Sequence, residues 1–155
     1  MSDLPGSAAD LLPLLTRAER LLARRVGGVL AVESLTIEAW RVLCLLADGR
    51  GHPMSEVAAE ASLPPGTLTK LVDQLVDRNL VFRRVDPFDR RRIRAYLTDR
   101  GRREHERIAA RVHTDLSGLT ASGDADLAGH LDDLIGRLEP DRRPCLVYPS
   151  PRPRD

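Results

Sequence analysis

Two groups of polar side chains in the middle of the chain have chemistry suited to a polyanion. The first is a dense arginine run, with six arginines between residues 83 and 94. Guanidinium groups bond phosphate oxygens and are attracted to the negative potential of a narrow DNA groove. Hydroxyl, amine and amide groups, which bond base edges as well as phosphates, lie just upstream. This second group comprises Thr67, Thr69, Lys70 and Gln74.

The charge of the chain is concentrated around these groups. The formal net charge is only +1, but residues 64–103 carry 11 basic and five acidic groups. Residues 1–63 and 104–155 have net charges of −2 and −3. A basic centre between acidic ends is typical of a protein that binds a polyanion. An arginine run alone is more often a solvated surface, so the surrounding elements must decide between the two interpretations.

Length and composition restrict the class of protein. A chain of 155 residues can fold as one domain with its own core. It has no apolar stretch of about 18 residues, so we expect no spanning helix and no membrane partner. Its start lacks the basic segment of a secretory signal. Two cysteines, Cys44 and Cys145, are too few for a disulfide framework, and we expect a cytoplasmic protein.

Hydrophobic spacing predicts three helices before the polar groups. Residues 8–30 have one apolar stripe at helical spacing, and the Gly27-Gly28 pair is expected to loosen or end this helix. Thr36 is suited to cap a second helix, and Ser55 to cap a short third helix over residues 56–61.

A helix followed by a hairpin is predicted in the basic centre. Residues 62–66, Ser-Leu-Pro-Pro-Gly, are predicted to form a turn. A helix then starts near Pro65 and runs to about Arg78, since proline is favoured at the first helical position. Asn79 is suited to a left-handed C-cap. Alternating β-forming residues then predict strands over 80–85 and 92–97, joined by a hairpin loop.

Two further helices are expected after the hairpin. Thr98 and Asp99 begin the first, and Ser122-Gly123-Asp124 ends it. The last helix has a leucine stripe, and the chain is rich in proline from Pro140 onward. The buried stripes of these two helices are predicted to be Ile108, Val112, Leu116 and Leu119, and Leu127, Leu131, Leu134 and Leu138.

The order of these central elements is that of a winged helix-turn-helix. An α-helix fits the DNA major groove, and an arginine-rich hairpin beside it reaches the minor groove or the backbone. A winged helix used only for contact with another protein is an alternative, although the basic centre argues against it. We find no phosphate loop or catalytic motif and expect no enzyme.

The sequence resembles the MarR family in these same segments. The run from Leu63 to Leu75 is similar to the family's recognition helix, and residues 80–84 and 86–92 are similar to its strand and wing. Residues 97–101, Leu-Thr-Asp-Arg-Gly, match the family's Leu-Thr-x-x-Gly motif. The resemblance covers roughly residues 9–138, and Asn79 stands where the family commonly has glycine.

The resemblance implies a mainly α-helical fold with a small β-wing, in a dimeric bacterial transcription regulator that needs no cofactor. It further implies a repressor of a pseudo-palindromic operator in double-stranded DNA, associated with the nucleoid and released by a small aromatic or anionic ligand. The expected regions are an N-terminal dimerisation helix (1–34), a DNA-binding winged helix (35–98), C-terminal dimerisation helices (99–139) and a Pro/Arg-rich tail (140–155).

Candidate contact residues follow from the same resemblance. The recognition-helix set is Pro65, Gly66, Thr67, Thr69, Lys70, Asp73 and Gln74. The wing set is Arg90, Arg91, Arg92 and Arg94, whereas Arg84 and Asp86 are structural candidates. Arg17 and Trp40 are candidates for lining a ligand pocket.

Two other switches are open from the sequence. His105 and His113 lie two helical turns apart and could hold Zn²⁺ together with Glu104 or a group of a partner chain, which would make the protein zinc-responsive. Isolated surface histidines are the more common case, and we assign no metal site. A thiol switch is disfavoured, because Cys44 lies on an apolar helix face where a buried, inert thiol is expected.

Overall fold

The computed structural model of the chain describes residues 10–120 and 125–139. The chain divides into two compact units, Met1–Asp115 and Leu116–Asp155. The helices and strands, in chain order, are α1 (Leu11–Ala31), α2 (Ile37–Leu46), β1 (His52–Pro53), α3 (Met54–Glu60), α4 (Pro65–Asp77), β2 (Val81–Val85), β3 (Ile93–Leu97), α5 (Asp99–Thr120) and α6 (Ala125–Leu138).

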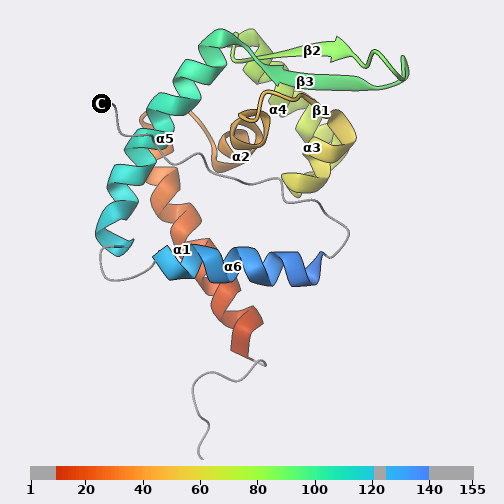
Figure 1. Cartoon of the computed structure of the whole chain (residues 1–155). Coiled ribbons are helices and arrows are strands. Elements are labelled where there is room, and N and C mark those ends of the chain that lie inside the picture. Colours follow the sequence, from red (N-terminus) through yellow and green to blue (C-terminus); the bar gives the residue numbers. More distant parts are fainter. Residues whose placement is uncertain (1–9, 121–124, 140–155) are drawn as a thin grey trace, which may run out of the picture. The chain divides into compact units, whose positions relative to one another are not determined.

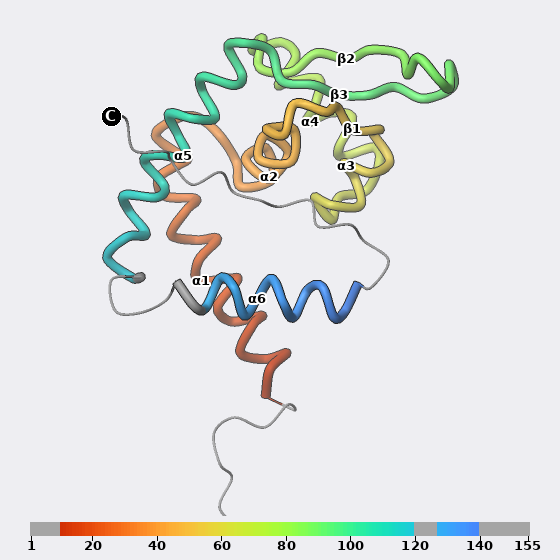
Figure 2. The backbone as a smooth tube through the Cα atoms, in the orientation of Figure 1, coloured from red at the N-terminus to blue at the C-terminus, as the bar shows by residue number. Residues whose placement is uncertain are grey.

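The predicted winged helix-turn-helix is confirmed in the first unit. Helices α2, α3 and α4 precede an antiparallel β2–β3 hairpin, which extends away from the helices and ends in an open loop (Figures 1 and 2). The sheet has a third strand, β1, which pairs with β3 in the order β1-β3-β2. Sequence patterning missed β1 because two residues, one of them a proline, give no alternation to detect.

Helix α1 corrects one expectation. The Gly27-Gly28 pair neither loosens nor ends it, and the helix continues to Ala31. Glycine in a helix interior costs about 1 kcal/mol relative to alanine. Val26 and Leu30, on either side of the pair, are buried in the core, and burying two aliphatic side chains offsets that cost. The helix ends instead before Ser34, which has a positive φ of 53°.

The start of α3 corrects a second expectation. The helix begins at Met54, with Pro53 at the N-cap position, so Ser55 lies inside its first turn and no side chain caps it. The chain reaches α3 directly from β1, and this strand fixes where the helix begins. The other predicted caps are confirmed. The Thr36 hydroxyl accepts a hydrogen bond from the Ala39 amide at 3.1 Å, and Asn79 is left-handed with φ 55°.

The core of the first unit lies where α2, α3, α4 and the sheet meet, and α1 and α5 add Leu30 and Ile108 to it. It fixes the orientation of α4, since one face of this helix is entirely buried there. Each aliphatic side chain buried in this way contributes about 1.5–3 kcal/mol. The largest fully buried side chains are Leu30, Val42, Leu43, Leu46, Val57, Leu68, Val72, Leu75, Leu80, Val81 and Ile108.

The Leu-Thr-x-x-Gly motif forms a tight junction between the wing and α5. The Thr98 hydroxyl accepts a hydrogen bond from the Gly101 amide at 2.8 Å and donates one to the Asn79 carbonyl at 2.7 Å. A Cβ atom on Gly101 would lie 1.9 Å from the Leu80 carbonyl oxygen. Only glycine therefore lets α5 begin against the end of the α4–β2 turn.

An ion-pair cluster holds α5 to the corner between α1 and α2. Arg107 donates two hydrogen bonds to Glu33, at 3.0 and 2.6 Å, and Arg111 pairs with the same carboxylate. The hydrogen bond from Arg107 is the largest influence that lowers the pKa of Glu33. These contacts connect residues that are far apart in the sequence, and they attach α5 to the turn between α1 and α2.

In the second unit, the leucine stripe of α6 is largely uncovered within the single chain. The exposed fractions of Leu127 and Leu138 are 53% and 72%, whereas Leu131 and Leu134 are half-buried. On α5, Ile108 is buried as predicted, but Leu119 is 52% exposed. The predicted break at 122–124 and the tail at 140–155 lie outside the described residues. No helix among the described residues is long and apolar enough to cross a membrane.

Candidate nucleic-acid interface

Helix α4 presents one polar face to solvent. Leu68, Val72 and Leu75 anchor the opposite face in the core. Because the helix repeats every 3.6 residues, this burial turns the intervening positions outward. The structure places all seven candidates of the recognition helix on the exposed side: Pro65, Gly66, Thr67, Thr69, Lys70, Asp73 and Gln74.

These seven residues differ in what they already bond. The Thr69 hydroxyl donates to the Pro65 carbonyl at 3.0 Å, and the Asp73 carboxylate accepts from Arg83 at 2.5 Å. No intramolecular side-chain bond is found for Lys70 or Gln74 among the described residues. Their donors and acceptors are therefore available to a partner.

The wing loop is organised by one buried carboxylate. Asp86 is only 3% exposed, and its Oδ1 atom accepts hydrogen bonds from the amides of Phe88 at 2.8 Å and Asp89 at 3.3 Å. Its Oδ2 atom accepts a bond from Arg94 Nε at 2.6 Å. The guanidinium of Arg94 and the two amides hold the pKa of Asp86 below its usual range. Asp86 thus closes the loop and stays ionised.

Arg94 has a different environment from the other wing candidates. The sequence groups it with the DNA contacts, but its guanidinium bonds Asp86 and the Gly51 carbonyl, the latter at 3.2 Å. Asp86 also raises the pKa of Arg94. In this position Arg94 connects the wing to the turn before β1 and has a structural role.

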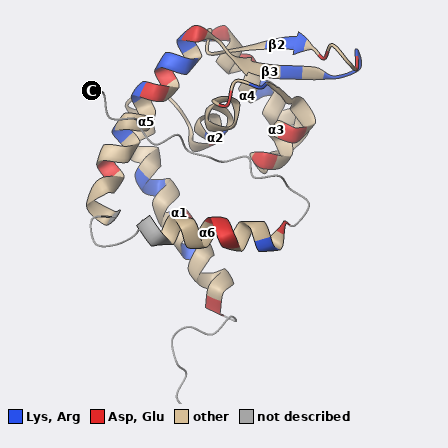
Figure 3. Cartoon of the chain, viewed as in Figure 1, with Lys and Arg blue, Asp and Glu red and all other residues tan. Residues whose placement is uncertain are grey.

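Arg90, Arg91 and Arg92 lie at the exposed end of the wing. Figure 3 shows basic residues along both strands of the hairpin and at its tip. Arg92 is paired with Asp89 at 3.4 Å, and both side chains are largely exposed. No side-chain bond is found for Arg90 or Arg91 among the described residues. The exposed tip of the wing is therefore positively charged.

Arg83 joins the wing to α4, which sequence reasoning missed. Its guanidinium donates to Asp73 and, at 3.4 Å, to the Thr69 carbonyl. The strand register, once known, indicates this contact. Arg83 is paired with Ala95, between the pairs Val81–Leu97 and Val85–Ile93, and so lies on the face of the hairpin whose base is buried. This contact fixes the wing against the exposed helix.

Neither ligand candidate lines the two cavities described below. Trp40 is 7% exposed and stacks on His105 with ring centroids 5.0 Å apart, as a core residue does. Arg17 is exposed on α1. A cavity of about 420 Å³ is lined by Val29 of α1 and by Ala110, Arg111, Thr114 and Asp115 of α5.

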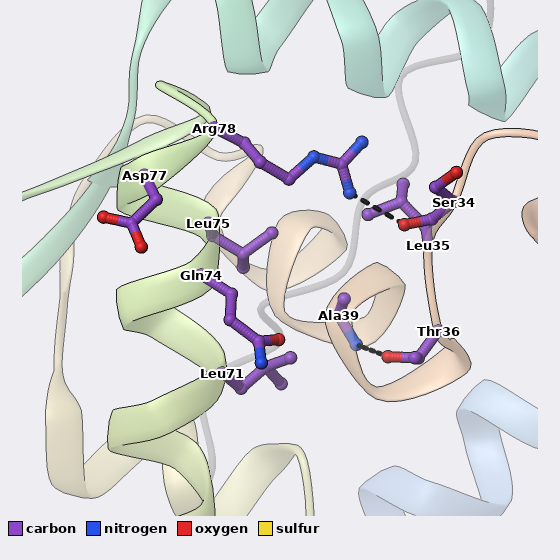
Figure 4. Close-up of a pocket in the computed structure, with 9 residues that line it drawn as sticks. All are labelled: Ser34, Leu35, Thr36, Ala39, Leu71, Gln74, Leu75, Asp77 and Arg78. Carbon is purple, nitrogen blue, oxygen red and sulfur yellow. Dashed lines mark hydrogen bonds between the residues drawn. The ribbon is translucent and has the colours of Figure 1, made fainter.

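A second cavity, of about 360 Å³, lies between the start of α2 and the C-terminal half of α4. Figure 4 shows Leu71, Gln74 and Leu75 extending from α4 toward α2. Arg78 closes one side by donating to the Ser34 carbonyl at 2.8 Å. Gln74 therefore lies at the edge of the polar face of α4.

The remaining switch candidates are placed as follows. Burial lowers the pKa of His105, whereas His113 is exposed. Among residues 10–120 and 125–139, no group of three or more His, Cys, Asp or Glu residues could hold a metal ion. Burial raises the pKa of the Cys44 thiol to about 12, which disfavours its reactive thiolate form. Cys145 lies outside the described residues.

Known proteins share this arrangement. A model of the MarR family matches residues 33–92, which run from the turn after α1 through the wing loop. The HTH-type transcriptional regulator TtmR of Methylorubrum extorquens is 30% identical over 117 residues, which are 76% of this chain and 60% of TtmR. The chain thus spans less than two thirds of TtmR.

Solved structures agree with the sequence comparisons. A MarR-family transcriptional regulator from Rhodococcus sp. RHA1 superposes with a TM-score of 0.73 at 26% identity, covering 87% of this chain and 96% of that one. CouR from Rhodococcus jostii RHA1, solved bound to p-coumaroyl-CoA, has a TM-score of 0.74 at 26% identity, with 92% and 99% covered. The family model, the sequence relatives and the shared fold agree: the chain is similar to the MarR family of transcriptional regulators, by family model over residues 33–92 and by fold over most of its length.

Proposed function

We propose that the protein binds double-stranded DNA sequence-specifically, with α4 in the major groove and the wing along the adjacent minor groove. The observation that carries the proposal is the bond from Arg83 to Asp73, because it joins an exposed polar helix and a basic hairpin into one surface. Phosphates would be neutralised mainly by Arg90 and Arg91, whose side chains are exposed.

We expect sequence readout to rest on Lys70 and Gln74. A lysine amine can bond the O6 and N7 atoms of guanine, and a glutamine amide can bond the N6 and N7 atoms of adenine. Both side chains are exposed, from adjacent turns of α4. The remaining exposed groups of α4 are suited to hold the helix in register on the backbone.

We further propose that the functional unit is a homodimer. The N-terminal half of α1 exposes a leucine-rich surface that includes Leu11, Leu14 and Leu15, at 46%, 59% and 37%. Exposed apolar surface of this extent favours a partner, and α5 and α6 carry further examples. A two-fold dimer places two recognition helices about one DNA turn apart and calls for a pseudo-palindromic operator.

Repression relieved by a small ligand is the regulatory mode we propose. The relative CouR is solved with p-coumaroyl-CoA, a ligand with an aromatic acyl group. In this chain, the open cavity between α1 and α5 offers space for a small aromatic molecule, and its wall includes both Arg111, which is paired with Glu33, and Asp115. A ligand there would act on the helices that frame the winged helix.

Selection of binding sites from a random duplex library tests the proposal. We expect the wild type to enrich a pseudo-palindrome, and Gln74→Ala or Lys70→Ala to change the preferred bases within each half-site. Arg91→Ala serves as the control, since loss of a phosphate contact lowers affinity without changing the enriched sequence. No enrichment by the wild type would contradict sequence-specific binding. An unchanged preference in both α4 variants would limit the helix to backbone contacts.

A further inference from the structure

The tip of the wing carries an aromatic side chain with no cover. Phe88 is 96% exposed, the largest exposed fraction among the described large hydrophobic residues that are not buried. The chain's other phenylalanine, Phe82, is half-buried and stacks on Tyr96 with centroids 5.2 Å apart. Burying a phenylalanine side chain is favourable, and Phe88 forgoes this gain in the single chain. A partner that covers Phe88 would recover it.

The loop presents Phe88 in a fixed position. Its amide donates to the Asp86 carboxylate, which is buried and paired with Arg94. Two backbone bonds brace the rest of the loop, from Asp86 N to Arg92 O at 2.8 Å and from Arg92 N to Asp89 O at 2.9 Å. A side chain on such a braced loop loses little conformational entropy when it binds.

The neighbouring side chains indicate the kind of partner. Arg90 and Arg91 lie on the same loop as Phe88 and are exposed, so a negatively charged surface must surround whatever covers the ring. Immediately behind the loop, Val85 and Ile93 form the last cross-strand pair and are 58% and 46% exposed. Duplex DNA has this combination, with phosphates outside and stacked, apolar base faces inside. Several minor-groove proteins insert apolar side chains between base steps in this way.

We propose that Phe88 is a wedge that enters the minor groove, partly unstacks one base step and bends the DNA beneath each wing. The inference rests on the proposed DNA binding and extends it to a deformation of the duplex. Pyrimidine–purine steps such as TA and CA unstack most easily, so the wedge would favour them at positions that α4 does not contact. Phe88 would then add to operator specificity without hydrogen bonding a base.

The test uses the full chain and a duplex enriched by the wild type. One set of duplexes carries 2-aminopurine at single positions outside the bases read by α4, because the fluorescence of this base rises when it unstacks. A second set carries donor and acceptor dyes at its ends to report bending. Both are measured at saturating protein, and the fold of each variant is checked by the fluorescence of the only tryptophan, Trp40.

With the wild type we expect a fluorescence rise at one position per half-site and a shortened end-to-end distance. Phe88→Ala should lose both signals and bind roughly tenfold more weakly, which corresponds to about 1.4 kcal/mol. It should leave the log–log salt slope unchanged, because it removes no charge. Phe88→Leu should keep part of the bend. Arg91→Ala is the matched control and should lower the salt slope by about one while keeping the bend at saturation.

Three results separate the possibilities. If Phe88→Ala keeps the fluorescence rise and the bend, the wedge is refuted although DNA binding stands. If Phe88→Ala leaves every DNA signal unchanged but loses binding to a second protein, Phe88 belongs to a protein interface and the wedge is again refuted. A wild type that binds no duplex overturns the proposed function itself.

Discussion

Arg91, on the wing loop, and Arg94, on β3, show how three residues of spacing separate two roles in the wing. Arg94 is turned inward to Asp86 and Gly51, whereas Arg91 is exposed and has no side-chain bond to any residue that the structure describes. Composition alone treats the two arginines alike. Their difference depends on the buried carboxylate, which the sequence shows only as one acidic residue in a basic run.

Arg91→Ala should weaken binding to every DNA sequence, because it removes a phosphate contact and not a base contact. The slope of log affinity against log salt should become shallower by about one. Fluorescence anisotropy with specific and scrambled duplexes at several salt concentrations measures both effects. Arg20→Ala, an equal loss of charge on α1, is the control and should change neither. Equal affinities for Arg91→Ala and the wild type at matched salt would exclude this role.

His105 should make stability depend on pH. Burial against Trp40 lowers its pKa in the folded state, so the unfolded chain binds a proton more readily. The free energy of unfolding should therefore fall as the pH drops below about 6.5, the ordinary histidine value, and should be unaffected well above it. His105→Phe should remove the part of this stability loss that comes from protonating His105, while keeping an aromatic ring beside Trp40.

The measurement is urea unfolding followed by tryptophan fluorescence at about pH 8 and about pH 5. His113→Phe is the control, since His113 lies on the same helix but is exposed. An identical pH dependence in His105→Phe and the wild type would show that His105 is not the responsible group.

The absence of a side chain at Gly101 allows α5 to begin directly after the wing. Gly101→Ala places a Cβ atom 1.9 Å from the Leu80 carbonyl oxygen, and a backbone atom cannot move aside as a flexible side chain can. We expect a loss of about 1–3 kcal/mol or more in the free energy of unfolding. Gly118→Ala on the same helix has open space around its Cβ and should stabilise by up to about 1 kcal/mol.

Denaturant midpoints at a fixed protein concentration compare these two variants with the wild type. Equal midpoints for Gly101→Ala and the wild type would mean that the α4–β2 turn yields, and that the glycine of the motif is not a steric requirement.

Most elements were predictable from local patterns, and the exceptions have physical causes. Helix α4 and the hairpin followed from proline placement, leucine spacing and strand alternation. Strand β1 could not be predicted, because its two residues are ordered by pairing with β3. The continuation of α1 through Gly27-Gly28 depends on the burial of Val26 and Leu30, which is a tertiary effect. The Arg83–Asp73 hydrogen bond could not be predicted either, because it depends on both the strand register and the position of α4 beside the hairpin.

The whole molecule is expected to be a two-fold dimer held by its long helices. Leu14→Glu places a charge within the exposed leucine surface of α1, where burying it in an interface would cost far more than leaving it in water. We expect the molar mass measured by light scattering to fall from that of two chains to that of one. Affinity for a two-half-site duplex should fall with it.

Val32→Glu is the matched control for this experiment. It replaces an aliphatic residue that is 70% exposed just beyond the other end of α1, so it adds the same charge outside the leucine surface. We expect it to remain dimeric. A Leu14→Glu protein that also stays dimeric would exclude this part of α1 from the interface.

The most direct test of the central claim is a salt titration of the wild type against its selected duplex and a scrambled duplex of equal length. The account predicts competitor-resistant binding to the selected duplex. It also predicts a linear loss of affinity in log–log form for both duplexes, as expected when several phosphates are neutralised. Equal affinity for the two duplexes at every salt concentration, or no binding at the lowest, would contradict a sequence-specific DNA-binding protein.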